Sequence, residues 1–205
     1  MIRKKTDIFI FDLGRVIIDF DMAYMTSVYV KEPEDASLVE AVVFDRKYWN
    51  RLDEGSIEDD EMKADFCSRL PERLHKKACA VYDNWYMNLN PIKGMFELVR
   101  ELKAMGKRLY LLSNISCLFA EKYRDIPLLG ELLSEFDGLV LSAPIRMLKP
   151  ERRIFEHLLE KYSLEPKECT FIDDNADNIA AAKEIGINTY LFDGDAQRLR
   201  EFIFM

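Results

Sequence analysis

The residues best suited to chemistry are polar side chains that directly follow short apolar stretches. Asp12 follows the stretch IFIF, and Asp173 with Asp174 follows CTFI. Ser113 and Asn114 follow a third stretch, LYLL, in the same way. One such aspartate alone is most simply a helix cap or a turn residue. That interpretation explains the joint arrangement poorly, so we expect a shared site.

The apolar stretches fit a series of alternating strands and helices. Beyond a first strand at 7–12, strands are predicted at 108–114, 138–142, 169–174 and 187–192. Apolar residues at helical spacing predict helices over 92–102, 150–162, 176–185 and 195–205. This alternation is typical of an α/β fold with a parallel sheet.

On such a sheet the polar residues named above fall at the carboxyl ends of the strands. That edge is where open α/β sheets bind ligands. Lys149 lies a few residues beyond the strand at 138–142 and is placed to reach the same crevice. Clustered carboxylates repel one another unless a cation intervenes, and oxygen ligands suit Mg²⁺, which often shares a substrate phosphate. The sequence therefore predicts a site for a metal and a phosphate group.

The region between the first strand and residue 91 has a different pattern of apolar residues. Helical spacing dominates and no convincing strand is visible, which predicts a helical insertion. Its bulky aromatic residues are more typical of a packed core than of a sugar-binding surface; they are Phe20, Tyr48, Trp49, Trp85 and Tyr86. The acidic stretch 53–61 is most simply a solvated helix face.

The composition predicts one elaborated globular domain. The chain has 205 residues, of which 49% are hydrophobic, and its net charge of -8 disfavours nucleic acid and anionic membranes as partners. No apolar run approaches the roughly 18 residues of a membrane span, and the polar start is not a secretory signal, so we expect a cytoplasmic protein. The four cysteines form no CxxC pair, and the two histidines form no triad pattern. The oligomeric state is not predicted.

Four motifs, FDLGRV, LLSN, LKP and FIDDNADN, resemble in order and spacing those of the haloacid dehalogenase (HAD) superfamily. The first and last are closest to the capped phosphatases of that superfamily, such as bacterial α-D-glucose-1-phosphate phosphatase. The resemblance implies a Rossmann-like parallel-sheet HAD core formed by residues 1–19 and 90–205. The helical insertion, residues 20–89, would then be the cap.

The resemblance also implies catalytic roles. Asp12 would be the nucleophile that attacks phosphorus to give an aspartyl-phosphate, which water then hydrolyses. Ser113 and Asn114 would hold the phosphoryl oxygens. Lys149 would neutralise the charge shared by Asp12 and the phosphate.

The expected cofactor is Mg²⁺, bound by Asp12, the backbone carbonyl of Gly14 and Asp174. The residues expected to orient these ligands are Asp173, Asn175 and Asn178. Gly14 departs from the commonest HAD phosphatase pattern, which has a second aspartate there as general acid and base. An enzyme without this donor should favour weakly basic leaving groups, unless water or a cap residue supplies the proton.

The function expected from these features is a Mg²⁺-dependent phosphatase for a small phosphorylated metabolite, with a sugar phosphate as the best guess. One alternative is a haloacid dehalogenase-type hydrolase, in which Asp12 attacks carbon without a metal. Another is a catalytically weak phosphate-binding or receiver-like regulator, although the order of the motifs does not fit a receiver.

Overall fold

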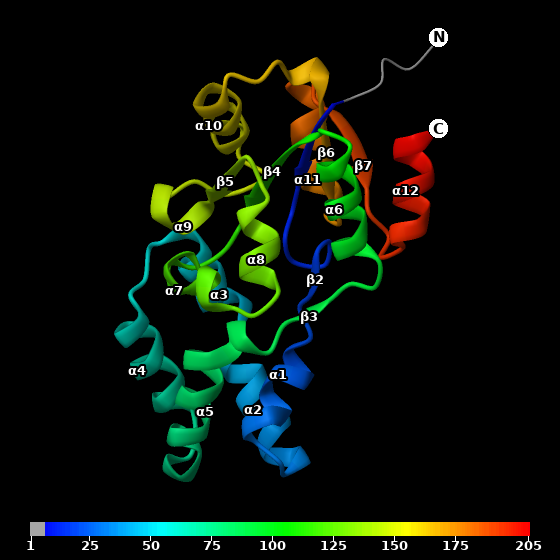
Figure 1. Cartoon of the computed structure of the whole chain (residues 1–205). Coiled ribbons are helices and arrows are strands. Elements are labelled where there is room, and N and C mark those ends of the chain that lie inside the picture. The colour runs from blue at the N-terminus through cyan, green and yellow to red at the C-terminus, as the bar shows by residue number, and fades with distance from the viewer. Residues whose placement is uncertain (1–6) are drawn as a thin grey trace.

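Five parallel strands form the central sheet of the computed structural model, which describes residues 7–205. They are β1 (Ile8–Phe11), β4 (Arg108–Ser113), β5 (Gly138–Leu141), β6 (Cys169–Asp173) and β7 (Asn188–Leu191). Their order across the sheet is β5-β4-β1-β6-β7, so β1 lies between β4 and β6 (Figure 1). The predicted α/β fold with a parallel sheet is confirmed.

Helices cover both faces of the sheet because the central strands are apolar on both sides. In β1, Phe9 and Phe11 join one core, which receives α6 (Met95–Ala104), α8 (Leu129–Ser134) and α12 (Ala196–Phe204). Ile8 and Ile10 point to the opposite face, where they join a core with α10 (Arg152–Tyr162) and α11 (Ala176–Glu184). This alternation is the period of two expected of a strand.

Short elements connect these layers. The helices α7 (Cys117–Lys122) and α9 (Ser142–Ile145) follow the carboxyl ends of β4 and β5. Single 3₁₀ turns occur at Trp85–Met87, Tyr123–Asp125 and Pro166–Glu168. Within residues 7–205, no helix has both the length and the apolar character needed to cross a membrane.

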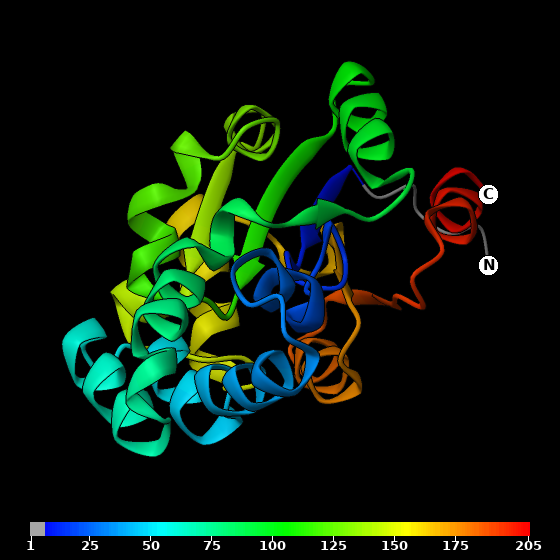
Figure 2. The same cartoon turned by 90° about the horizontal axis from the view of Figure 1, so that it is seen from below.

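The helical insertion consists of five helices that project from one end of the sheet (Figures 1 and 2). They are α1 (Met22–Tyr29), α2 (Pro33–Val43), α3 (Arg46–Glu54), α4 (Asp59–Arg69) and α5 (Glu72–Asn84). Two short strands, β2 (Ile18–Asp19) and β3 (Asn90–Pro91), pair antiparallel where the chain enters and leaves it. We expected no strand between β1 and residue 91; two residues per strand are too few to produce a periodic pattern.

The division into a core of 1–19 and 90–205 and a cap of 20–89 stays our proposal, and residues 1–6 of it lie outside the described part of the chain. The insertion has an aromatic core of its own. The Phe44 and Trp49 rings lie 4.9 Å apart, and Phe20 contacts Trp85 at 5.6 Å between centroids. Trp85 also stacks on Phe119 of α7 at 5.9 Å. As predicted, the two tryptophans are buried packing residues rather than a sugar-binding surface.

Candidate active site

Three neighbouring strands bring the predicted site residues together. Asp12 directly follows β1, Ser113 is the last residue of β4, and Asp173 is the last residue of β6. Because β1 lies between the other two strands, the three side chains meet at the carboxyl edge of the sheet, where the strand order reverses. All three are largely buried, with exposed fractions of 9%, 2% and 0%.

Lys149 completes this group from the loop after α9. Its ammonium group lies 2.8 Å from Asp12 Oδ1 and 2.7 Å from Asp173 Oδ2. The Lys149 side chain is only 1% exposed, and its Nζ lies 5.5 Å from the centre of the Phe171 ring. The predicted reach of Lys149 into the crevice is therefore seen directly in these distances.

The pKa values of Asp12 and Lys149 are both raised, for different reasons. Burial raises the pKa of Asp12 to about 6, and Lys149 opposes this shift while the negative charge of Asp173 adds to it. Burial alone would lower the pKa of Lys149, but the two carboxylates outweigh it and raise the pKa above its ordinary value. Since one buried cation faces two carboxylates, a further positive charge would stabilise the ionised form of Asp12.

Asp173 has hydrogen bonds to both of its oxygens. Oδ1 accepts from the Asn175 backbone N–H at 2.8 Å, and Asn178 Nδ2 lies 3.1 and 3.0 Å from Oδ1 and Oδ2. Lys149 donates to Oδ2. The side chain of Asn175 is occupied elsewhere, because it caps α11 by accepting from the Asp177 backbone. Asp173 therefore holds Lys149 in place.

A metal ion fits next to these residues. Ligand oxygens of Asp12, Asp173 and Asp174 lie within 4.8 Å of one another. Asp173 is saturated by hydrogen bonds, which leaves Asp12 and Asp174 as the available carboxylates. Asp12 Oδ1 accepts from the Leu13 N–H at 2.7 Å and from Lys149, while Oδ2 accepts no hydrogen bond from a described residue. Hard oxygen ligands of this kind suit Mg²⁺.

Gly14 is not required by the backbone or by the space around it. Its φ is not positive, and a Cβ built on Gly14 would have no atom within 4 Å apart from its chain neighbours. The next residue, Arg15, does adopt a positive φ of 57°. The fold would therefore accept a side chain at position 14.

Asn114 has a contact that the sequence did not predict. Its Nδ2 donates to the Lys149 carbonyl at 2.9 Å, and its Oδ1 accepts from the Lys149 N–H at 2.8 Å. We expected this side chain to hold a phosphoryl oxygen. Nδ2 and Oδ1 each make one hydrogen bond to the Lys149 backbone, so Asn114 joins the β4 loop to the segment that carries the lysine. Its contact with a phosphoryl oxygen stays a prediction.

Sequence reasoning missed Asp53, which lies at the end of α3 in the insertion. Ser142 Oγ donates to the Asp53 carbonyl at 2.5 Å. Burial raises the pKa of the Asp53 carboxyl to about 7; Arg46 and Lys149 oppose this shift, and the charge of Asp12 adds to it. Asp53 is half-buried rather than exposed, so the predicted solvated face is wrong for this residue. The spacing of Arg46, Asn50 and Asp53 along one helix face was the signal available for finding it.

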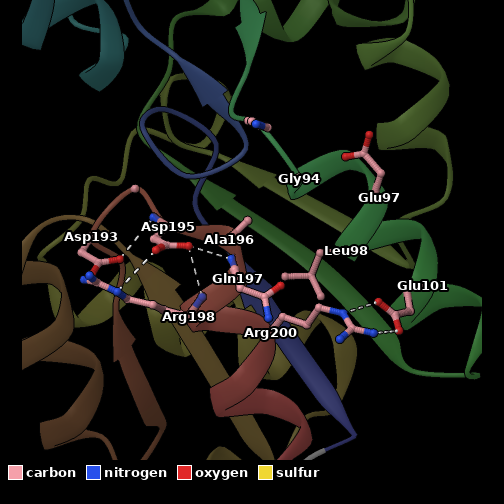
Figure 3. Close-up of a pocket in the computed structure, with 12 residues that line it drawn as sticks. Gly94, Glu97, Leu98, Glu101, Asp193, Asp195, Ala196, Gln197, Arg198 and Arg200 are labelled. Atoms are coloured by element: carbon pink, nitrogen blue, oxygen red, sulfur yellow. Dashed lines mark hydrogen bonds and ion pairs between the residues drawn. The ribbon is translucent and has the colours of Figure 1, made fainter.

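A groove lies away from these residues, between α6 and the start of α12 (Figure 3). Its volume is about 780 Å³. Both of its arginines form ion pairs within the groove: Arg198 contacts Asp193 at 2.5 Å, and Arg200 contacts Glu101 at 2.7 Å. None of the predicted site residues lines it.

Comparison with known proteins identifies the class. Residues 6–186 match the model of the haloacid dehalogenase-like hydrolase family. The chain therefore belongs to this family and is a HAD-type hydrolase. Membership confirms the predicted superfamily, whereas the closer resemblance to glucose-1-phosphate phosphatase stays a prediction.

The chain is similar to several named proteins over most of its length. A sesquiterpene phosphatase of Aspergillus oryzae is 28% identical over 180 residues, which are 87% of this chain and 85% of that protein. A D-ribitol-5-phosphate phosphatase of Bacteroides thetaiotaomicron is 28% identical over 194 residues, covering 88% and 89%. A HAD family enzyme from Bacteroides thetaiotaomicron, solved as a mutant with magnesium and inorganic phosphate, superposes with a TM-score of 0.72. It is 23% identical, and the match covers 95% of this chain and 98% of that one, which supports the fold.

Proposed function

We propose that this protein is a Mg²⁺-dependent phosphatase that hydrolyses a small phosphorylated metabolite through an aspartyl-phosphate at Asp12. The observation that carries the proposal is the environment of the Asp12 carboxylate. One oxygen is held by Leu13 and the buried Lys149, the other accepts no hydrogen bond from residues 7–205, and Asp174 lies beside the carboxylate. A nucleophile, a cation for the transferring group and a metal-binding carboxylate therefore share one small space.

In this proposal Asp12 attacks phosphorus, and water later releases phosphate from the aspartyl-phosphate. Ser113, at the end of the neighbouring strand, holds the phosphoryl group. Lys149 offsets the negative charge that spreads over the phosphoryl oxygens, and Asp173 keeps its ammonium group in position. Asp12, Asp174 and the Gly14 carbonyl would hold Mg²⁺, which supplies further positive charge for the phosphoryl oxygens.

The group of carboxylates favours this reaction over the alternatives. A dehalogenase that attacks carbon needs no cation, so it has no use for Asp174 beside Asp12. A weak regulator would bind phosphate without turnover. Phosphate release that depends on Mg²⁺ therefore separates the proposal from both.

For the organic part of the substrate, a sugar or polyol phosphate is the class that we propose. The face of α3 that carries Asp53 also carries Arg46 and Asn50, which are exposed and polar. Hydroxyl-rich substrates suit such a surface. The D-ribitol-5-phosphate phosphatase relative supports this class, and the sesquiterpene phosphatase relative makes a prenyl phosphate the competing candidate.

The experiment is a phosphate-release screen of the purified protein against sugar, polyol, nucleotide, carboxylic-acid and prenyl monophosphates. Each is measured with Mg²⁺ and with a chelator, beside Asp12→Asn as the inactive control. We expect release with Mg²⁺ only, fastest for a sugar or polyol phosphate, and none from the variant. Release that continues in chelator, or halide release from a haloacid without Mg²⁺, would contradict the proposal.

A further inference from the structure

The proposed reaction requires a proton for the departing oxygen, and position 14 does not supply one. A glycine has no side chain that donates, yet the structure would accept one there. A positioned general acid contributes about 10²–10⁴-fold, most for strongly basic leaving groups. Resting on the proposed function, we propose that Asp53 of the insertion is the general acid and base of this active site.

The first argument is the placement of Asp53 on its helix. Arg46, Asn50 and Asp53 are spaced i, i+4 and i+7, so they share one face of α3. Trp49 and Leu52, on the adjacent side, are buried in the insertion. Among the five helices of the insertion, α3 lies against α9, at the end of the sheet that carries the site (Figure 1).

The second argument is that the end of α3 is fixed to the catalytic core. Ser142 Oγ donates to the Asp53 carbonyl at 2.5 Å and accepts from the Ile115 N–H at 2.8 Å. Gly55, with a φ of 69°, lies so close to α9 that an added Cβ would be 2.5 Å from the Ala143 carbonyl oxygen. The Ser142 hydroxyl therefore links the Asp53 backbone directly to Ile115 in the loop that follows β4.

The third argument is the charge around the Asp53 carboxyl. The groups that act on it are Arg46 on its own helix, Asp12 after β1, and Lys149. Asp53 therefore lies within electrostatic range of the nucleophile, although it belongs to the insertion. Its pKa of about 7, raised chiefly by burial, leaves a large share of the carboxyl protonated near neutral pH.

Asp53 gives up one proton and regains one within each turnover. When Asp12 forms its bond to phosphorus, the bond from phosphorus to the leaving oxygen breaks, and that oxygen takes the proton of Asp53. The alcohol departs and Asp53 is left as a carboxylate. This carboxylate then removes a proton from the water that attacks phosphorus, the Asp12–phosphorus bond breaks, and Asp53 is protonated again. Only water is consumed.

The test compares Asp53→Asn with the wild type on aryl and alkyl phosphates graded by leaving-group pKa, in saturating Mg²⁺. We expect the wild-type rate to depend weakly on leaving-group basicity. Asp53→Asn should lose about 10²-fold or more in kcat/KM on alkyl esters and less than about tenfold on a nitrophenyl ester. Glu54→Gln, the adjacent carboxyl, is the matched control and should keep the wild-type profile.

Rescue adds an independent measurement. Because position 14 accepts a side chain, adding Gly14→Asp to Asp53→Asn should restore part of the lost rate on alkyl esters. A uniform loss across all esters, or an unchanged rate on alkyl esters, would overturn the role of Asp53. A steep leaving-group dependence of the wild type would also overturn it, even where a variant fails to fold. The absence of Mg²⁺-dependent release of phosphate by the wild type from any ester would instead reject the proposed function.

Discussion

Removing Lys149 should destabilise the protein far more than removing a surface lysine. Its ammonium group lies 2.8 Å from Asp12 and 2.7 Å from Asp173, and its side chain is 1% exposed. Loss of one partner from a buried ion pair costs about 3–5 kcal/mol, because the other charge is left without compensation. We therefore expect Lys149→Met to lower the free energy of unfolding by about 3–5 kcal/mol at pH 8 without metal.

The cost should depend on pH. Burial raises the pKa of Asp12 to about 6, which is above its value in the unfolded chain. A group whose folded-state pKa is raised stabilises the fold below its unfolded pKa and loses that contribution as the pH rises through the folded pKa. At pH 5 Asp12 is more readily neutral, so the penalty of Lys149→Met should be smaller than at pH 8.

The assay is urea denaturation of wild type and Lys149→Met at pH 5 and pH 8, in chelator. Lys63→Met is the matched control, because Lys63 forms a 2.7 Å pair with Asp83 but both side chains are partly exposed, at 31% and 47%. An exposed pair is worth about 0.2–1 kcal/mol. Equal losses for the two variants, or a loss for Lys149→Met that does not grow from pH 5 to pH 8, would refute the reasoning.

Three further changes test other parts of the structure. Gly55→Ala should lower the free energy of unfolding, measured by heat or urea, by about 1–3 kcal/mol, because the new methyl meets the Ala143 backbone. Gly106→Ala should lower it less, because the space there is open. Calorimetric Mg²⁺ titration should show at least about tenfold weaker binding for Asp174→Asn than for Asp173→Asn, because Asp173 is already saturated by hydrogen bonds; similar affinities would remove Asp174 from the metal site. Gly14→Ala should leave stability unchanged or raise it by about 0.4–1 kcal/mol, as unfolding curves would show, because the folded backbone there does not need glycine.

The sheet and its polar edge were predictable because each depends on local pattern. Asp12, Ser113 and Asp173 each stand at the end of an apolar stretch. In a parallel sheet this places all three at the same edge, whatever the order of the strands. Lys149 was predictable from its position after the strand at 138–142. The short elements β2, β3, α7 and α9 were not predicted, since they span too few residues to show a period.

Contacts between segments distant in sequence were beyond prediction. The paired hydrogen bonds between Asn114 and the Lys149 backbone join residues 35 positions apart. The bond from Ser142 to the Asp53 carbonyl joins residues 89 positions apart. An acidic residue among other acidic residues has the pattern of a solvated surface. Only the docking of α3 on α9 shows that Asp53 is half-buried against the core.

The central claim is that Asp12 carries the phosphoryl group during turnover. The most direct measurement is rapid quenching of the wild type while it hydrolyses an ester in Mg²⁺, followed by borohydride reduction and peptide mass spectrometry. Reduction of an aspartyl-phosphate leaves homoserine, so we predict homoserine at position 12 with substrate and Mg²⁺, and none in chelator. Continued turnover with no modification at Asp12, or with the phosphoryl group on another residue, would contradict the account.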